Sequence, residues 1–165
     1  MSGPTVPSLV PSAIDIILDI VGSDVTHMSA SGARILSDAI DIANARLEFA
    51  NGCVANVTSS RVSTKGERKM RIFQPDCYIS VDFQSKGLKV HSKGSGEMFP
   101  GIPEIVVEES SFEESDALLA EISAFVESVQ TGKPPRVSGE DGRRALATAM
   151  RITELVHATP SYQRP

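Results

Sequence analysis

The segment ARLEFANGCVANVTSSR, residues 45–61, predicts two β-strands joined at Asn51-Gly52. Asn-Gly between two runs of strand-forming residues is the strongest short-range signal of a β-hairpin. If these two residues form the whole turn, Arg46 lies opposite Val57 and both side chains point to the same side. Each face of the hairpin then mixes apolar with polar side chains. We therefore expect its second face to contact another subunit, another domain or a ligand, with a solvated face as the alternative.

The rest of the chain predicts more strands, flanked by helices. Alternating apolar residues and the turn signals between them indicate strands at residues 25–31, 40–50, 53–63, 68–74, 77–83, 87–92 and 104–109. Their short connections require antiparallel neighbours, because a parallel crossover needs a dozen residues or more. Apolar residues at helical spacing predict helices at 14–21, 113–131 and 138–157, and the Gly/Pro-rich segment 94–103 is expected to be a loop.

These elements define an α+β fold. We expect an open, antiparallel-rich mixed β-sheet with all three helices packed on one face, because each helix carries an apolar stripe that needs an apolar surface. The other face stays free for oligomerisation. Residues 12–157 are expected to form the domain, with flexible tails at 1–11 and 158–165.

The helix termini carry capping signals. Ser12 and Asp15 resemble a capping box at the start of the first helix, and Gly22 marks its end. Ser138 and Asp141 form the same pattern before the last helix.

Composition excludes several classes of protein. The 165-residue chain has a formal net charge of −5, which disfavours a nucleic-acid partner, and no apolar run long enough to span a membrane. Cys53 and Cys77 form no ligand pattern and are interpreted as buried thiols of a cytoplasmic protein. No metal site is expected, since the three histidines lie on separate elements: His27, His91 and His157.

Four blocks of sequence, taken together, resemble the C-terminal domain of the Gfo/Idh/MocA oxidoreductases, with the bacterial nucleotide-sugar dehydrogenases as the most similar branch. The blocks are IDIILDIVG (14–22), SDAIDIANARLEFANGCVANVTSSRVS (37–63), RKMRIFQPDCYISVDF (68–83) and VSGEDGRRALATAMRI (137–152). The resemblance covers residues 12–157. It implies an open sheet that closes a sugar site and builds an oligomer.

In that family an N-terminal Rossmann domain binds NAD(P) and carries a Glu-Lys-Pro motif with a catalytic lysine. This sequence has no Gly-x-Gly-x-x-Gly after a strand and no Glu-Lys-Pro, and the Gly94-x-Gly96 pair starts no helix. We therefore expect no cofactor site in this chain. NAD(P) is implied for a full-length parent protein, and the resemblance implies a separate Rossmann domain as partner.

The resemblance also implies an Asp-x-x-x-His motif before the first helix, whose histidine takes part in proton transfer. Here Ser12 occupies the histidine position and Ser8 the aspartate position, and Ala13 replaces the next aspartate. Serine cannot replace imidazole as a base near neutral pH. We therefore expect no catalytic residue in this chain, and of that motif Asp15 alone remains.

Five residues are candidates for binding. Asp15 and Arg61 are predicted to contact substrate, Asp15 at a sugar hydroxyl and Arg61 at a diphosphate. Arg46, Glu48 and Val57 are predicted to lie at an oligomer interface on the open face. Three of them have a structural alternative: helix capping for Asp15, and cross-strand pairing for Arg46 and Arg61, for example with Glu48.

A basic run lies near the middle of the chain. It is interpreted as a solvated loop, with a nucleotide-phosphate contact as the alternative. The run consists of Lys65, Arg68, Lys69 and Arg71.

The sequence supports two functional hypotheses. The first is the substrate-side and oligomerisation domain of an NAD(P)-dependent sugar or nucleotide-sugar oxidoreductase, inactive alone and assembling as a homodimer or homotetramer. The second is a free-standing, non-catalytic module that self-associates through its open sheet. No nucleic-acid or membrane partner is expected in either case.

Overall fold

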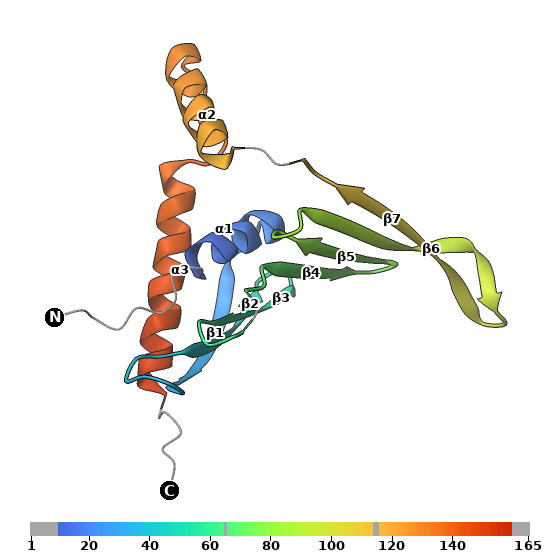
Figure 1. Ribbon diagram of the computed structural model, residues 1–165, viewed down its shortest axis with the longest axis horizontal. Helices are drawn as coiled ribbons and strands as arrows, with labels where there is room; N and C mark the ends of the chain where they lie inside the picture. The colour runs from blue at the N-terminus through green and yellow to red at the C-terminus, as the bar shows by residue number, and fades with distance from the viewer. Residues whose placement is uncertain (1–9, 65, 114–115, 160–165) are drawn as a thin grey trace, which may run out of the picture. The chain divides into compact units, whose positions relative to one another are not determined.

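A computed structural model describes residues 10–64, 66–113 and 116–159. The elements in chain order are α1 (Val10–Val21), β1 (Val25–Ala33), β2 (Ile42–Phe49), β3 (Val54–Ser60), β4 (Lys69–Gln74), β5 (Cys77–Asp82), β6 (Gly87–Phe99), β7 (Ile102–Ser111), α2 (Ala117–Thr131) and α3 (Gly139–Ala158). The strands form two antiparallel sheets, of order β1-β2-β3 and β4-β5-β6-β7. The chain divides into two compact units, one with the first sheet, α1 and α3, the other with the second sheet and most of α2 (Figure 1).

The α+β class is confirmed, and every predicted helix and strand is present. The strands are shared between two sheets, whereas the sequence predicted one. In the first unit, α1 and α3 pack against each other and against the first sheet. α2 has no buried residue, so its predicted packing on a sheet face does not occur within the described residues.

The hairpin register differs by one residue from the prediction. The amide of Phe49 donates to the carbonyl of Cys53 at 2.9 Å, so the loop has three residues, 50–52, and Gly52 takes a φ of +84°. Arg46 therefore lies opposite Asn56, and Val57 lies opposite Ala45. A three-residue hairpin loop with glycine in the left-handed region is a common alternative to the two-residue turn.

This register separates the two faces of the first sheet. The helix-covered face of β2 carries only apolar side chains, from Ala43, Ala45, Leu47 and Phe49. Val57 packs against this core, so its predicted place on the open face is wrong. A shift of one residue moves every side chain of a strand to the opposite face.

The core of the first unit joins both helices to the sheet. Ile14 of α1, Leu47 of β2 and Ile152 and Val156 of α3 are almost fully buried. Figure 1 shows α1 and α3 beside this sheet. The capping box at the start of α3 is confirmed, and the amide of Asp141 donates to the Ser138 hydroxyl.

The start of α1 differs from the prediction. The helix begins at Val10, so Ser12 lies inside its first turn and is not the N-cap residue. The Ser12–Asp15 capping box is therefore wrong. The apolar periodicity locates the helix, but a serine in the first turn does not fix which residue precedes it.

Two further details of the sequence prediction are wrong. Residues 94–103 are not a loop, because β6 and β7 continue through them as a long twisted hairpin (Figure 1). A Cβ at Gly94 or Gly96 would lie 2.8 or 2.9 Å from a carboxyl oxygen of Glu104, so a larger residue at either position would require this side chain to move. Cys53 is exposed rather than buried, because it follows directly after the hairpin loop.

Candidate functional site

The open face of the first sheet forms a shallow groove of about 340 Å³. It crosses all three strands, because Ser29, Arg46 and Asn56 are cross-strand neighbours, as are Ser31, Asn44 and Thr58. Hydroxyl, amide and guanidinium groups therefore alternate over a small area.

These side chains hydrogen-bond to one another. The Thr58 hydroxyl donates to the Asn44 amide oxygen at 2.9 Å. Arg46 donates from Nε to Glu48 at 3.1 Å and from Nη1 to Asn56 at 3.4 Å. Arg46 and Glu48 are thus on the open face as predicted, and the cross-strand pairing of Arg46 is with Asn56. Such groups suit a ligand or partner that offers hydroxyl groups, because each can donate or accept.

Arg61 is held by a buried carboxylate. Its Nε donates to Asp41 at 2.6 Å, and it also hydrogen-bonds the Ser37 hydroxyl. The Asp41 carboxylate is 1% exposed and accepts from the backbone amides of Ile35, Leu36 and Ser37 at 2.7, 2.7 and 3.1 Å. Asp41 therefore holds the loop between β1 and β2, and Arg61 binds both Asp41 and Ser37 of that loop.

This arrangement stabilises the charged form of Asp41. Hydrogen bonds from the amides of Leu36 and Ile35 hold the pKa of the Asp41 carboxyl well below its ordinary value, and the Arg61 guanidinium lowers it further. The sequence did not single out Asp41. Its signal is a carboxylate at the start of a strand, between two isoleucines.

The predicted residues at the N-terminal end of α1 are not gathered with the others. Asp15 lies on α1 and is partly exposed, and no hydrogen bond joins it to Arg61 among the described residues. Ser12 is exposed in the first turn of α1, and Ser8 lies outside the described residues.

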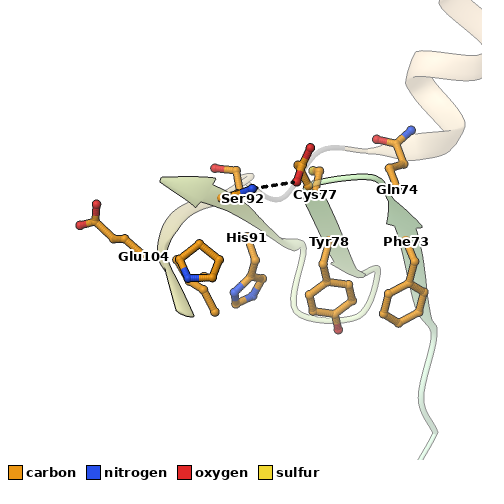
Figure 2. Close-up of a pocket in the computed structure, with 11 residues that line it drawn as sticks. Phe73, Gln74, Cys77, Tyr78, His91, Ser92 and Glu104 are labelled. Carbon is orange, nitrogen blue, oxygen red and sulfur yellow. Dashed lines mark ion pairs between the residues drawn. The ribbon is translucent and has the colours of Figure 1, made fainter. Parts of the chain in front are cut away.

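The second unit carries a separate pocket of about 440 Å³ (Figure 2). Phe73, Tyr78 and His91 lie side by side on β4, β5 and β6, with ring centroids 4.9 and 5.1 Å apart. Lys93 and Asp76 form an ion pair of 3.8 Å at its margin. Sequence reasoning missed this row, although the Pro75-Asp76 turn signal could have paired Phe73 with Tyr78.

The described residues contain no group of three or more histidine, cysteine, aspartate or glutamate side chains placed to hold a metal ion. None of the described helices is both long and apolar enough to cross a membrane.

Comparison with known protein families shows the family to which this chain belongs. Residues 2–157 match the model of the C-terminal alpha/beta domain of an oxidoreductase family. The chain therefore belongs to the Gfo/Idh/MocA oxidoreductase family, as the four sequence blocks indicated.

Two curated proteins of known activity are similar in sequence to this chain. UDP-N-acetylglucosamine 3-dehydrogenase from Acidithiobacillus ferrooxidans is 37% identical over 145 residues, which are 88% of this chain and 46% of that protein. Myo-inositol 2-dehydrogenase from Thermotoga maritima is 27% identical over 134 residues, 77% of this chain and 39% of that protein. The chain thus spans less than half the length of these relatives.

A solved structure agrees with these matches. The structure of the Acidithiobacillus ferrooxidans UDP-N-acetylglucosamine 3-dehydrogenase superposes with a TM-score of 0.84 at 34% identity. The match covers 94% of this chain and 52% of that one.

Proposed function

We propose that this chain is the substrate-side and oligomerisation domain of an NAD(P)-dependent oxidoreductase that acts on a nucleotide sugar. The observation that carries the proposal is its likeness to UDP-N-acetylglucosamine 3-dehydrogenase, at 37% identity and a TM-score of 0.84. The polar open face supports it, because a sugar and a neighbouring subunit both offer groups for the hydroxyls and amides of Ser29, Ser31, Asn44 and Thr58.

The chemistry requires a second domain. Hydride transfer belongs to the nicotinamide cofactor, and the protein supplies binding, orientation and proton transfer. In our proposal this chain holds the sugar and contributes to the oligomer, while a Rossmann domain with its lysine supplies the cofactor site. The chain alone is therefore expected to be inactive.

In our proposal the serine at position 12 leaves this domain without a general base for the proton transfer. At the position where the family resemblance places a histidine, a serine leaves no side chain ready to accept the hydroxyl proton. Ser12 is exposed on the first turn of α1 and is not needed as a helix cap, so substitution there is compatible with the fold.

The experiment joins the Rossmann domain of the Acidithiobacillus ferrooxidans relative to residue 12 of this chain. The chimera is expected to bind UDP-N-acetylglucosamine and to reduce NAD⁺ slowly. A positioned general base contributes roughly 10²–10⁴-fold, so Ser12→His should raise kcat at least about tenfold with little change in sugar affinity.

A control variant distinguishes the effect of a general base at position 12 from the effect of a larger side chain there. Ser12→Gln adds a polar side chain that does not titrate near neutral pH, and it should leave kcat unchanged. Equal rates in the histidine and glutamine variants would mean that Ser12 does not occupy the position of the base. A folded chimera that binds NAD⁺ but no nucleotide sugar would refute the proposed substrate class.

A further inference from the structure

Phe73 is an exposed aromatic residue in an ordered position. It lies on β4, at the edge of the second sheet, and is 76% exposed. One face of its ring stacks on Tyr78 at 4.9 Å with 17° between the planes, and Tyr78 in turn stacks on His91 (Figure 2). This row of three stacked rings restricts the orientation of the Phe73 ring. No other ring of the described residues stacks on the outer face of Phe73.

Arg71 lies two residues before Phe73 on the same face of β4, since side chains alternate along a strand. The other cations on this face are paired: Lys69 with Glu67 at 3.2 Å, Lys89 with Glu109 at 2.7 Å and Lys93 with Asp76 at 3.8 Å. Arg71 has no hydrogen bond or ion pair with any other described residue. The basic run, predicted to be a solvated loop, thus places one unpaired guanidinium on a strand beside an open ring face.

We propose that Phe73 and Arg71 form a binding site for a nucleotide, in which the base stacks on the outer face of Phe73 and Arg71 binds the phosphate. This inference concerns the second unit by itself, and it rests on the proposed function for the choice of a nucleotide as the ligand. Every base has an aromatic face that stacks on phenylalanine, and guanidinium binds phosphate through two parallel hydrogen bonds.

The spacing suits both contacts at once. Two residues along a strand rise about 7 Å, which is on the scale of the separation between a pyrimidine base and its 5′-phosphate. Pairing of β4 with the same strand of a second copy is the competing use of this edge. It is disfavoured, since Lys69 and Arg71 place positive charge along the strand, a common means by which proteins keep sheet edges apart.

The test is a calorimetric titration of the 165-residue chain with UDP, uridine and ribose 5-phosphate, followed by proton NMR of the aromatic rings. UDP is expected to bind and to shift the Phe73 ring signals upfield, and the two partial ligands to bind more weakly. Base stacking on an aromatic ring predicts that Phe73→Leu weakens UDP about 5- to 100-fold. Arg71→Gln should weaken UDP binding by a similar factor, so that UDP no longer binds more tightly than uridine.

Two variants serve as matched controls. Lys89→Gln removes a cation of the same face that is already paired with Glu109, and Tyr78→Phe keeps the ring row. Both should bind UDP as the unsubstituted chain does. If Lys89→Gln and Arg71→Gln reduced the affinity for UDP equally, UDP would be attracted by the positive charge of the whole face. That result would overturn the proposed site.

Two further results would overturn it. One is unchanged UDP affinity in Phe73→Leu. The other is a dimer that Phe73→Leu dissociates while UDP does not bind, which would assign the ring row to self-association. The chimera separates this inference from the proposed function. If the chimera turns over nucleotide sugar and Phe73→Leu does not change the rate, the nucleotide site is refuted and the proposed function stands. If UDP binds at Phe73 but the chimera shows no turnover, the proposed function is refuted and the nucleotide site stands.

Discussion

The one-residue shift in the central hairpin makes a sharp prediction about two valines of β3. Val57 faces the helices and packs against the core, whereas Val54 is 41% exposed and lies opposite Glu48 on the open face. Val57→Asp and Val54→Asp are the same chemical change, three residues apart on one strand. The structure predicts that Val57→Asp destabilises the fold and that Val54→Asp does not.

The magnitude follows from burial. Full burial of a valine side chain is worth about 1.5–3 kcal/mol, so half-buried Val57 contributes roughly 1 kcal/mol. Placing a polar group without a partner on the apolar face costs about 1–3 kcal/mol more. The expected loss in Val57→Asp is therefore about 2–4 kcal/mol, or roughly 5–15 °C in Tm for a chain of this size. Val54→Asp should stay within about 0.5 kcal/mol, as is usual for surface changes.

Thermal and urea unfolding followed by circular dichroism measure both variants. Leu47→Ala calibrates the scale, because this fully buried residue should lose about 2–5 kcal/mol. Sedimentation at several concentrations shows whether either valine also affects assembly. If Val54→Asp proves the more destabilising change, the hairpin has the two-residue turn and the register reasoning is wrong.

Two further predictions concern the first unit. Asp41, whose pKa in the fold lies well below its ordinary value of 3.8, contributes its full stabilisation above that value and loses it as the pH falls below 3.8 toward the lowered pKa. Asp41→Asn should therefore reduce stability at pH 7 and reduce the further loss of stability as the pH falls below about 4, as measured by urea midpoints. At Gly32 a Cβ would lie 2.5 Å from Val156 and 3.0 Å from Ile40, so Gly32→Ala should cost about 1–3 kcal/mol. Gly66→Ala, where nothing lies within 4 Å, should be neutral in the same melts.

Element types were predictable from the sequence because they depend on local patterns. Helical spacing of apolar residues located α1 and α3, and Ser138 with Asp141 fixed the start of α3. Period-two alternation located the seven strands, and short connections made their neighbours antiparallel. The family followed from order and spacing of the four blocks.

Register was not predictable from the same patterns. Asn51-Gly52 is compatible with a two-residue or a three-residue loop, and only contacts beyond the hairpin decide between them. Here the Asn51 amide donates to the carbonyl of Val21 at the end of α1, and its oxygen accepts from the Cys53 amide. A tertiary contact therefore sets which face of β3 is apolar.

Long-range side-chain pairs were not predictable for a similar reason. Arg61 was predicted to contact a diphosphate because arginine binds such groups through two hydrogen bonds, with cross-strand pairing as the alternative. Its partner Asp41 is 20 residues away and becomes its neighbour only when β2 and β3 pair. The Phe73 row was missed because its members are spread over three strands, although each pairing follows from a turn signal.

The corrected register also changes what an oligomer of this chain would bury. Without Val57, the open face of the first sheet offers Val54 beside polar side chains such as Arg46 and Asn44, which already hydrogen-bond to their neighbours. Contacts there exchange one set of hydrogen bonds for another, so they orient a partner more than they attract it. Apolar surface lies elsewhere, on α2, where Leu118, Phe125 and Val129 are each at least 65% exposed. Removal of such surface from water drives association, so assembly that depends on α2 should tolerate Arg46→Glu.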